Sequence, residues 1–444
     1  MAGHRTLLGR PLGRRPTALR DSAPRRTLRL SRHQEGARPM HDETTIGARL
    51  RALRRWRGMS LDELAGLAGL SKGFLSMAER GQRALDRRSH IAALANALRV
   101  SETDLTGGPH LGPDPVQSEP HAYVSPLRVA LESNSFHADP VVERARPLPE
   151  LVALMTGHVE KHRRAYDYIT VGQDLPDLID ELHWHVAQPA DEAAQRLALE
   201  TLVEAYMCAA GMARSLRHPD LGQFAATRAD EAAVLLDDPI ARGKAAFSVI
   251  RPNAANWHRV QTLAERAADR LQPHIRDDRD VPVLGMLTLN AALAAAASRN
   301  RDAAEHWLNE AADLARRVPD DLKNNWQAFS KTNVAIWRVT VGVELGKGGG
   351  EVAELAKGVT EAKLDIHPGR KTCFLADVGR GLARDPKWRN DAIRWLRRSE
   401  ETAPQRFRND PKVAETIAVM LEQARVAAQG RELRGMAARM GIPH

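Results

Sequence analysis

The sequence predicts an all-α protein, with a small five-helix domain at residues 40–106 and a long series of helical hairpins over residues 127–444. Two observations predict this class. Two short amphipathic helices with their own capping residues follow one another within residues 60–81. From residue 196 onward, apolar residues recur at three- and four-residue spacing over most of the chain, which is the period of a helix with one buried face.

The helix pair carries its start and stop signals in the sequence itself. Ser60 and Glu63 stand at the spacing of a capping box, in which each residue satisfies a free amide at the helix start. Gly69 follows where a left-handed residue is needed to end that helix, and Ser71 can cap the next one. A three-residue turn between two such helices is typical of a helix-turn-helix, which predicts contact with DNA.

A longer pattern supports this interpretation. The matching residues are Ser60-x-x-Glu63-Leu64-Ala65, Gly69-Leu70-Ser71, Leu75-Ser76 and Glu79-Arg80-Gly81, preceded by a basic first helix. With this pattern, residues 46–105 resemble the Cro-like, or Xre-type, DNA-binding domain. In that arrangement the second helix of the pair enters the major groove and the first helix crosses the backbone. The resemblance therefore implies sequence-specific binding to double-stranded DNA by a homodimer.

The directions of the side chains suggest a role for each residue of this domain. Residues at the start of the second helix, or opposite Leu75 and Ala78, are free to reach base edges. We expect base readout from Ser71, Lys72, Gly73, Phe74, Ser76 and Met77. We expect phosphate contacts from Ser60, Arg80, Arg83, Arg87 and Arg88, with a solvated arginine as the alternative for each arginine. The resemblance also implies a structural ion pair between Arg54 and Glu79.

Basic charge is concentrated toward the N-terminus. The formal net charge is +9, and residues 1–39 hold ten arginines against only two acidic residues. Residues 40–105 hold eleven basic and eight acidic residues, and the remainder holds 44 basic and 46 acidic residues. The bulk of the chain therefore lacks the charge of a polyanion-binding surface. The two cysteines form no CxxC and the longest apolar run is too short for a bilayer, so we expect a cytoplasmic protein with reduced thiols and no membrane partner.

Two segments have the composition of chain without regular structure. Residues 1–39 are rich in Arg and Pro, and we expect them to be disordered. They could be a basic arm lying along DNA or a transit peptide, but we favour a third interpretation, in which translation starts at Met40, directly before the first helix. Residues 107–126 are rich in Gly and Pro, and we expect a linker without helix there.

The second region is predicted to consist of packed helical hairpins. Several hairpins show a loose tetratricopeptide pattern, most clearly at residues 374–404, so we expect a tetratricopeptide-like α-solenoid. Residues 329–346 and 434–441 also resemble the C-terminal region of actinobacterial Xre-type regulators. Helices are expected at residues 196–216, 222–236, 257–271, 283–297, 302–318, 325–345, 371–383, 388–402 and 411–429.

A solenoid of this kind presents a concave groove, which suits a peptide, a small-molecule effector or a partner protein. We expect Asn290, Asn333 and Trp337 to lie in that groove, with ordinary packing between helices as the alternative. No cofactor, metal site or catalytic motif is expected. The leading hypothesis is a dimeric transcriptional regulator. The rival is an interaction scaffold in which the solenoid is the working part and the small domain is a non-specific tether, and an enzyme is a more distant third.

Overall fold

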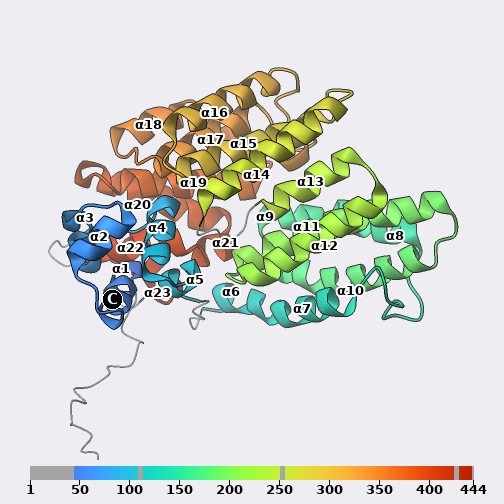
Figure 1. The fold of residues 1–444 in the computed structure, drawn as a ribbon, viewed down its shortest axis with the longest axis horizontal. Helices are drawn as coiled ribbons and strands as arrows, with labels where there is room; N and C mark the ends of the chain where they lie inside the picture. The colour runs from blue at the N-terminus through green and yellow to red at the C-terminus, as the bar shows by residue number, and fades with distance from the viewer. Residues whose placement is uncertain (1–44, 109–113, 251–255, 425–429, 443–444) are drawn as a thin grey trace, which may run out of the picture. The chain divides into compact units, whose positions relative to one another are not determined.

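The computed structural model describes residues 45–108, 114–250, 256–424 and 430–442, and these residues form helices and turns without strands (Figure 1). The prediction of an all-α protein is therefore confirmed for the part of the chain that is described. The predictions for residues 1–39 and for a start at Met40 lie outside the described residues.

The first five helices form a small unit, which we call the N-terminal bundle. They are α1 (Ile46–Trp56), α2 (Leu61–Ala68), α3 (Lys72–Glu79), α4 (Arg88–Leu98) and α5 (Glu102–Thr106). The bundle has its own apolar core, built around Ile46, Leu50, Leu64, Leu75, Leu85, Ile91, Leu94, Leu98 and Leu105. All five helices contribute to this core, and on α1 and α4 its members recur at three- or four-residue spacing, so the five-helix prediction is confirmed.

The segment that follows the bundle is helical where a linker was predicted. Helix α6 (Pro115–Ser118) leads into the 3₁₀ turn η2 (Glu119–Tyr123) and then into α7 (Val124–Ser133). The Asp114 side chain caps α6 by accepting from Gln117 N, and Pro115 takes the first helical position, where a missing amide costs nothing. The prediction of a helix-free linker is therefore wrong for residues 115–126.

The remaining helices, together with α6 and α7, form what we call the helical body. Its longer helices are α10 (Tyr168–Ala187), α11 (Glu192–Ser215), α12 (Pro219–Leu236), α13 (Pro239–Val249), α14 (Trp257–Leu271), α15 (Val281–Ala297), α16 (Arg301–Ala315), α17 (Lys331–Glu344), α19 (Pro368–Leu382), α20 (Arg389–Thr402) and α22 (Pro411–Ala424). Its shorter elements are α8 (Leu148–Ala153), η3 (Leu154–Val159), α9 (Glu160–Ala165), η4 (Gln272–His274), η5 (Trp326–Ala328), α18 (Gly350–Lys357), η6 (Glu361–Leu364), η7 (Pro386–Trp388), α21 (Pro404–Arg408) and α23 (Arg431–Arg439).

Most of the predicted helices are present, with two differences at their starts. The helix predicted at residues 302–318 starts one residue earlier, at Arg301, because Asn300 caps it by accepting from Ala303 N. The helix predicted at residues 325–345 is interrupted, and α17 starts only after Ser330, whose hydroxyl accepts from Asn333 N. In both cases a polar side chain next to the helix start takes the free amide.

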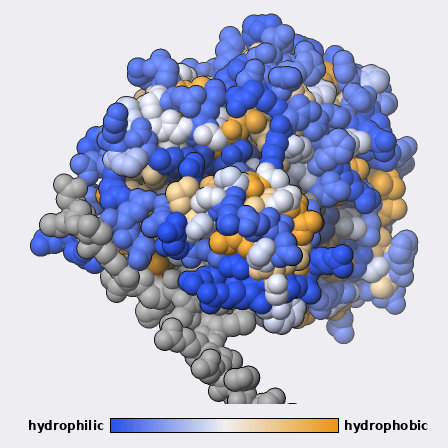
Figure 2. All heavy atoms as spheres, turned by 60° about the vertical axis from the view of Figure 1, so that its left-hand side comes forward, coloured by the Kyte–Doolittle hydropathy of each residue, from blue (hydrophilic) through white to orange (hydrophobic). Residues whose placement is uncertain are grey.

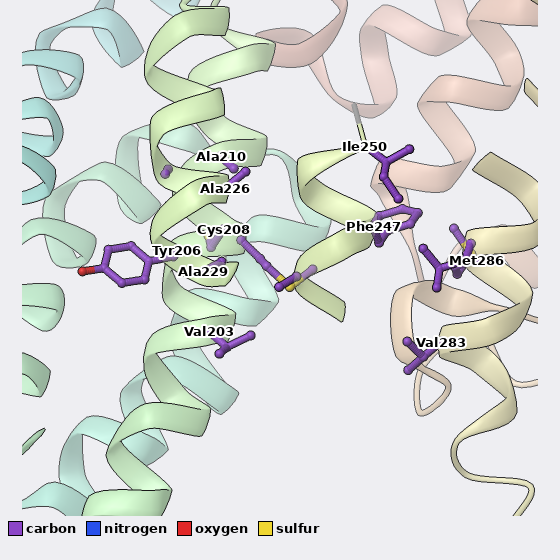
Figure 3. Close-up of a cluster of buried hydrophobic side chains, with 14 of the residues drawn as sticks. Val203, Tyr206, Cys208, Ala210, Ala226, Ala229, Phe247, Ile250, Val283 and Met286 are labelled. Atoms are coloured by element: carbon purple, nitrogen blue, oxygen red, sulfur yellow. The ribbon is translucent and has the colours of Figure 1, made fainter. Parts of the chain in front are cut away.

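Small residues let the helices of the body pack closely, as the sequence indicated. Cys208, Ala210, Ala226 and Ala229 lie between α11 and α12 in the core shown in Figure 3. Gly222 belongs to the same contact, since a Cβ atom there would lie 2.6 Å from Arg214 Cγ. Small side chains at these positions allow neighbouring helix axes to approach one another.

Helix α17 joins two apolar cores of the body. Trp337 and Val341 belong to the core of residues 124–341, and Val339 and Val343 belong to the core of residues 322–442. The tetratricopeptide-like repeat stays a prediction.

Candidate nucleic-acid interface

The turn between α2 and α3 is fixed by side-chain caps at both helices. Ser60 Oγ accepts from Glu63 N at 3.2 Å, and Glu63 Oε2 accepts from Ser60 N at 2.7 Å, which completes the capping box. This backbone hydrogen bond lowers the pKa of the exposed Glu63 carboxyl. Gly69 ends α2 with φ +60°, and Ser71 Oγ accepts from Phe74 N at 3.2 Å to start α3.

Helix α1 holds the far end of α3 through a buried ion pair. Arg54 Nε and Nη2 donate to the two carboxylate oxygens of Glu79 at 2.6 and 2.8 Å, and Arg54 Nη1 donates to Met59 O at 2.8 Å. The pair implied by the family resemblance is therefore present. The backbones of the two helices also touch, because a Cβ atom at Gly47 would lie 2.0 Å from Ala78 O. The angle of α3 is thus set by α1.

The outward face of α3 presents most of the residues expected to read bases. Ser71, Lys72 and Gly73 are exposed, and Ser76 and Met77 are half-buried. Lys72 Nζ donates to Asp62 Oδ2 on α2 at 2.7 Å. Both side chains are more than half exposed, so the pair is weak and Lys72 can exchange it for another acceptor.

Phe74 is less free than the sequence suggested. Its ring makes an edge contact with the buried ring of His90 at 4.8 Å, and the Arg83 guanidinium lies 5.4 Å from its centre. Arg83 and Arg80 are exposed, and Arg80 Nε donates to Ser76 O at 3.1 Å within the same helix end. Arg80 and Arg83 therefore lie where phosphate contacts were expected, whereas Phe74 belongs partly to the bundle core.

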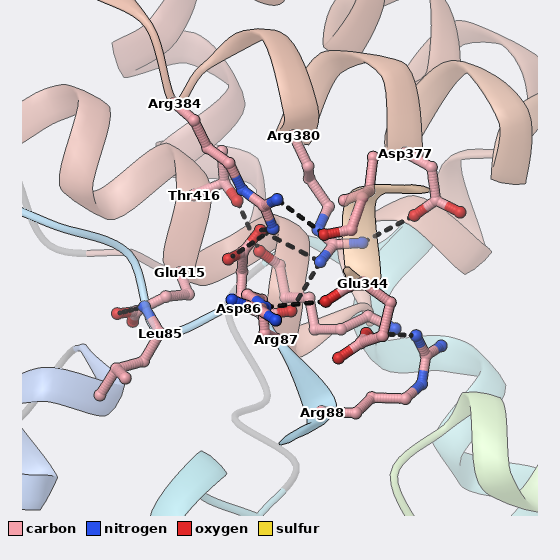
Figure 4. Close-up of polar contacts among 12 residues, drawn as sticks. Leu85, Asp86, Arg87, Arg88, Glu344, Asp377, Arg380, Arg384, Glu415 and Thr416 are labelled. Atoms are coloured by element: carbon pink, nitrogen blue, oxygen red, sulfur yellow. Dashed lines mark hydrogen bonds and ion pairs between the residues drawn. The ribbon is translucent and has the colours of Figure 1, made fainter. Parts of the chain in front are cut away.

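The other two arginines expected to contact phosphate point into the protein. Arg87 Nε donates to Glu344 O at 2.8 Å, and Arg88 Nη1 donates to Glu344 Oε2 at 3.1 Å (Figure 4). Both guanidinium groups are thus occupied by α17 of the body. The expectation of a phosphate contact is corrected for these two residues, because an acceptor more than 250 positions away holds them.

The bundle is docked on the body through buried charged groups. The buried carboxylate of Asp86 accepts from Arg380 Nη2 at 3.1 Å and from Arg384 Nη2 at 3.0 Å (Figure 4). Burial raises the pKa of Asp86, but the charges of Arg384 and Arg380 outweigh that effect and hold it below the usual value. No local sequence signal identifies such a contact.

Two body carboxylates also cap helices of the bundle. Glu415 Oε2 accepts from Ile46 N at the start of α1 at 2.7 Å, and Glu415 Oε1 accepts from Leu85 N at 3.1 Å. Glu344 Oε1 accepts from Ser89 N in the first turn of α4 at 3.1 Å. A carboxylate at a helix N-terminus satisfies a free amide and is favoured by the helix dipole.

The body also contributes basic groups beside α3. Arg299 Nη1 donates to Gly69 O at 2.9 Å, and Arg299 Nη2 donates to Ala68 O at 3.3 Å, so a body arginine caps the end of α2. Arg301 is exposed and lines a hollow of about 370 Å³ together with Ser71 and Phe74. On the face shown in Figure 2, hydrophilic residues predominate and hydrophobic residues gather in separate patches.

The comparison with known protein families agrees with this geometry. Residues 45–106 match the family described as "Helix-turn-helix domain". These residues form a helix-turn-helix domain of the DNA-binding kind. The matched range covers α1 to α5 of the N-terminal bundle. No curated protein and no solved structure matches the chain.

The residues expected in a peptide groove are buried between helices. Asn333 is fully buried, and its Nδ2 donates to Gln327 O at 3.4 Å. Asn290 and Trp337 are each 4% exposed, and Asn290 Nδ2 donates to Phe247 O at 3.3 Å. The prediction that these three residues form one open groove is therefore wrong, although Asn290 and Trp337 do line a partly open cavity.

Two further findings concern metal sites and membrane spans. Within the described ranges, no three His, Cys, Asp or Glu side chains come together in a way that could hold a metal ion. None of the described helices is both long enough and apolar enough to span a membrane.

Proposed function

We propose that the protein is a sequence-specific transcriptional regulator of the Xre type that acts as a homodimer, and that its helical body carries effector or partner binding. No enzymatic activity forms part of this proposal. One observation carries it: α3 presents Lys72, Gly73, Ser76 and Met77 on a face that the docked body leaves accessible. Residues at these positions of a recognition helix contact base edges in the major groove.

The charges around α3 support the same interpretation. Arg80 and Arg83 lie beyond the end of α3 and Arg301 lies near its start, so exposed basic groups flank the helix on both sides. Such groups neutralise phosphates and fix the register of the helix on DNA. Lys72 is the residue best suited to donate to guanine O6 and N7.

A titration of the full chain against genomic DNA fragments tests the proposal. We expect selected fragments to bind specifically, with a footprint of two half-sites about 34 Å apart, as a two-fold symmetric dimer requires. Lys72→Ala should weaken binding to a selected site roughly tenfold to a hundredfold, the range expected for one lost base contact. Its thermal stability should not change, because the ion pair with Asp62 is exposed.

The matched control is Lys357→Ala, which removes an exposed lysine of α18 that is also paired with a carboxylate. It should bind DNA as the wild type does. Binding that responds to salt but shows no sequence preference would instead support the rival function, a protein-interaction scaffold tethered non-specifically to DNA.

A further inference from the structure

A cavity of about 400 Å³ lies between the helix-turn-helix domain and the helical body. Helices α4 and α5 form its wall on the domain side, and the body contributes residues of α11, α19, α21 and α22 among others. Its volume is in the range of sites for small molecules.

The wall of this cavity has an excess of positive charge. Among the described residues that line it, three are acidic, namely Glu102, Asp377 and Asp410. Seven are basic, namely Arg88, Arg214, Arg217, Arg370, Arg380, Arg406 and Lys412. Buried charged groups in proteins are normally balanced by partners of opposite charge, so this excess calls for an explanation.

Carboxylates of the protein account for only three of the seven basic groups. Arg88 is paired with Glu344, and Arg380 with Asp86 and Asp377. Arg406 Nη2 lies 3.1 Å from an Asp410 oxygen. Among the residues that the structure describes, no carboxylate lies at ion-pair distance from the other four cations.

In the described ranges, the side chains of two of the four remaining cations donate only to backbone carbonyls. Arg217 Nη2 donates to Thr106 O at 2.8 Å, and Arg370 Nη2 donates to Gln327 O at 3.0 Å. A neutral carbonyl satisfies a donor but does not neutralise its charge. Burial and the charge of Arg49 lower the pKa of Arg217 to about 10, and the charge of Asp410 opposes this shift only in part.

The charges of the other two cations, Arg214 and Lys412, have still weaker partners. Arg214 Nη2 donates to the amide oxygen of Gln223 at 3.2 Å, and the Lys412 ammonium has no hydrogen-bond partner among the described residues. Burial and the charge of Arg88 lower the pKa of Lys412 to about 8, although Asp410 lies close enough to raise it in part. Within the described part of the chain, the cavity therefore holds four cations that form no ion pair, with Asp410 the acidic group that acts on two of them from a longer distance.

We propose that this cavity is a binding site for a small polyanion, an organic molecule that carries two or more negative charges on phosphate or carboxylate groups. Guanidinium groups match both kinds of oxyanion with paired hydrogen bonds, and a lysine adds a mobile point charge. The volume suits a small molecule and leaves no room for a folded partner.

The position of the cavity gives such a ligand a consequence for DNA binding. Arg88 and Glu102 belong to the helix-turn-helix domain, whereas Arg214, Arg370 and Lys412 belong to the body. The four unpaired cations belong to the body, and one of them, Arg217, already donates to Thr106 O of α5, so an anion held by these cations would lie against the domain and change the free energy of its docked arrangement, which is a coupling between two sites. This consequence rests on the proposed function, but binding of the anion does not.

Thermal denaturation of the full chain without DNA tests the site. At constant ionic strength, pyrophosphate or citrate should raise the midpoint in a saturable way, and chloride should not. A response to pyrophosphate alone identifies phosphate as the ligand group, and a response to citrate alone identifies carboxylate. The site is contradicted if neither anion gives a saturable shift.

Two cavity variants and one control locate the response. Lys412→Met and Arg214→Met should each weaken anion binding at least tenfold, the loss expected for one charge-assisted hydrogen bond. Lys412→Met should also be at least as stable as the wild type without ligand, because an uncompensated charge is gone. Lys357→Met makes the same change at an exposed position and should respond as the wild type does. Unchanged anion affinity in both cavity variants would overturn the proposal.

A DNA titration then tests the coupling. Pyrophosphate should change the affinity for a selected DNA fragment at least threefold in the wild type and leave Lys412→Met unchanged. An anion that binds without changing the DNA affinity supports the site and contradicts the coupling. If no DNA fragment is selected at all, the proposed function fails while the thermal shift still decides the anion site.

Discussion

The helix-turn-helix domain has two charged faces, and they differ in how far their ion pairs are exposed to solvent. On the outward face, Lys72 and Asp62 form an ion pair with 59% and 68% of their side chains exposed. On the docked face, Asp86 pairs with Arg380, and these side chains are only 4% and 3% exposed. An exposed pair can exchange its partner for a phosphate or a base at little cost, whereas a buried pair cannot.

The comparison shows why four arginines close together in the sequence separate into two pairs. Arg80 and Arg83 stay on the outward face, and Arg87 and Arg88 turn into the docked face to meet Glu344. The direction of each side chain is decided by where the body lies, since all four residues follow α3 within nine positions. Basic composition near a recognition helix is therefore not enough to assign a phosphate contact.

The largest expected loss of stability comes from removing a charged group of the docked face. Asp86→Asn removes one carboxylate and leaves the buried Arg380 without that partner, so the free energy of unfolding should fall by about 4 kcal/mol. Asp62→Asn makes the same change on the outward face and should cost less than about 1 kcal/mol. Urea denaturation of both variants measures the difference. Equal losses would show that the two faces do not differ as described.

A smaller loss is expected where α1 touches α3. Gly47→Ala places a Cβ atom 2.0 Å from Ala78 O, and backbone cannot move aside as a flexible side chain can. We expect a loss of about 3 kcal/mol and weaker DNA binding, because α3 must shift. The control is Gly66→Ala in α2, where the new Cβ meets nothing within 4 Å and should stabilise the helix by up to about 1 kcal/mol. A stable Gly47→Ala variant would contradict the close approach of these helices.

The smallest expected effect is a change of stability with pH that depends on the buried His90. Burial, with the charges of Arg87 and Arg299, lowers the pKa of His90 to about 3, from 6.5 in the unfolded chain. Between these values the unfolded chain binds the extra proton, so the free energy of unfolding falls as the pH falls below 6.5. Between pH 7 and pH 5, His90 should account for about 2 kcal/mol of that fall.

His90→Asn removes this contribution. At pH 8 the free energies of unfolding of variant and wild type should differ only by the change in packing against Phe74. As the pH decreases, the variant should become more stable relative to the wild type. Unfolding free energies from urea titrations at pH 8, 7, 6 and 5 give the slope. Parallel slopes for the two proteins would mean that His90 is accessible to protons in the folded state.

Short sequence patterns predict the helix starts and ends that are fixed by hydrogen bonds between neighbouring residues. The capping box of Ser60 and Glu63, the left-handed Gly69 and the cap at Ser71 each depend on residues within three or four positions. The same logic was available at Asp114 and Pro115, which are a cap and a first-turn proline. There the density of Gly and Pro predicts a linker, whereas the cap and the first-turn proline start a helix.

Contacts between distant segments could not be predicted in the same way. The partners of Arg87 and Asp86 lie 257 to 298 positions away, and no period or spacing in the sequence links them. The excess charge of the cavity is likewise invisible in the composition, because the body as a whole is nearly neutral. Asn290 and Trp337 line a partly open cavity between the helix-turn-helix domain and the body, rather than the concave groove that a solenoid predicts.

Glu344 and Glu415 have a practical implication for work on the DNA-binding part alone. Helix α4 has no side-chain cap of its own, and its Ser89 amide is satisfied from α17, while the Ile46 amide of α1 is satisfied from α22. A fragment ending at residue 106 would lose both acceptors and expose these amides to water. The starts of two helices in the helix-turn-helix domain therefore depend on acceptors from the far end of the same chain.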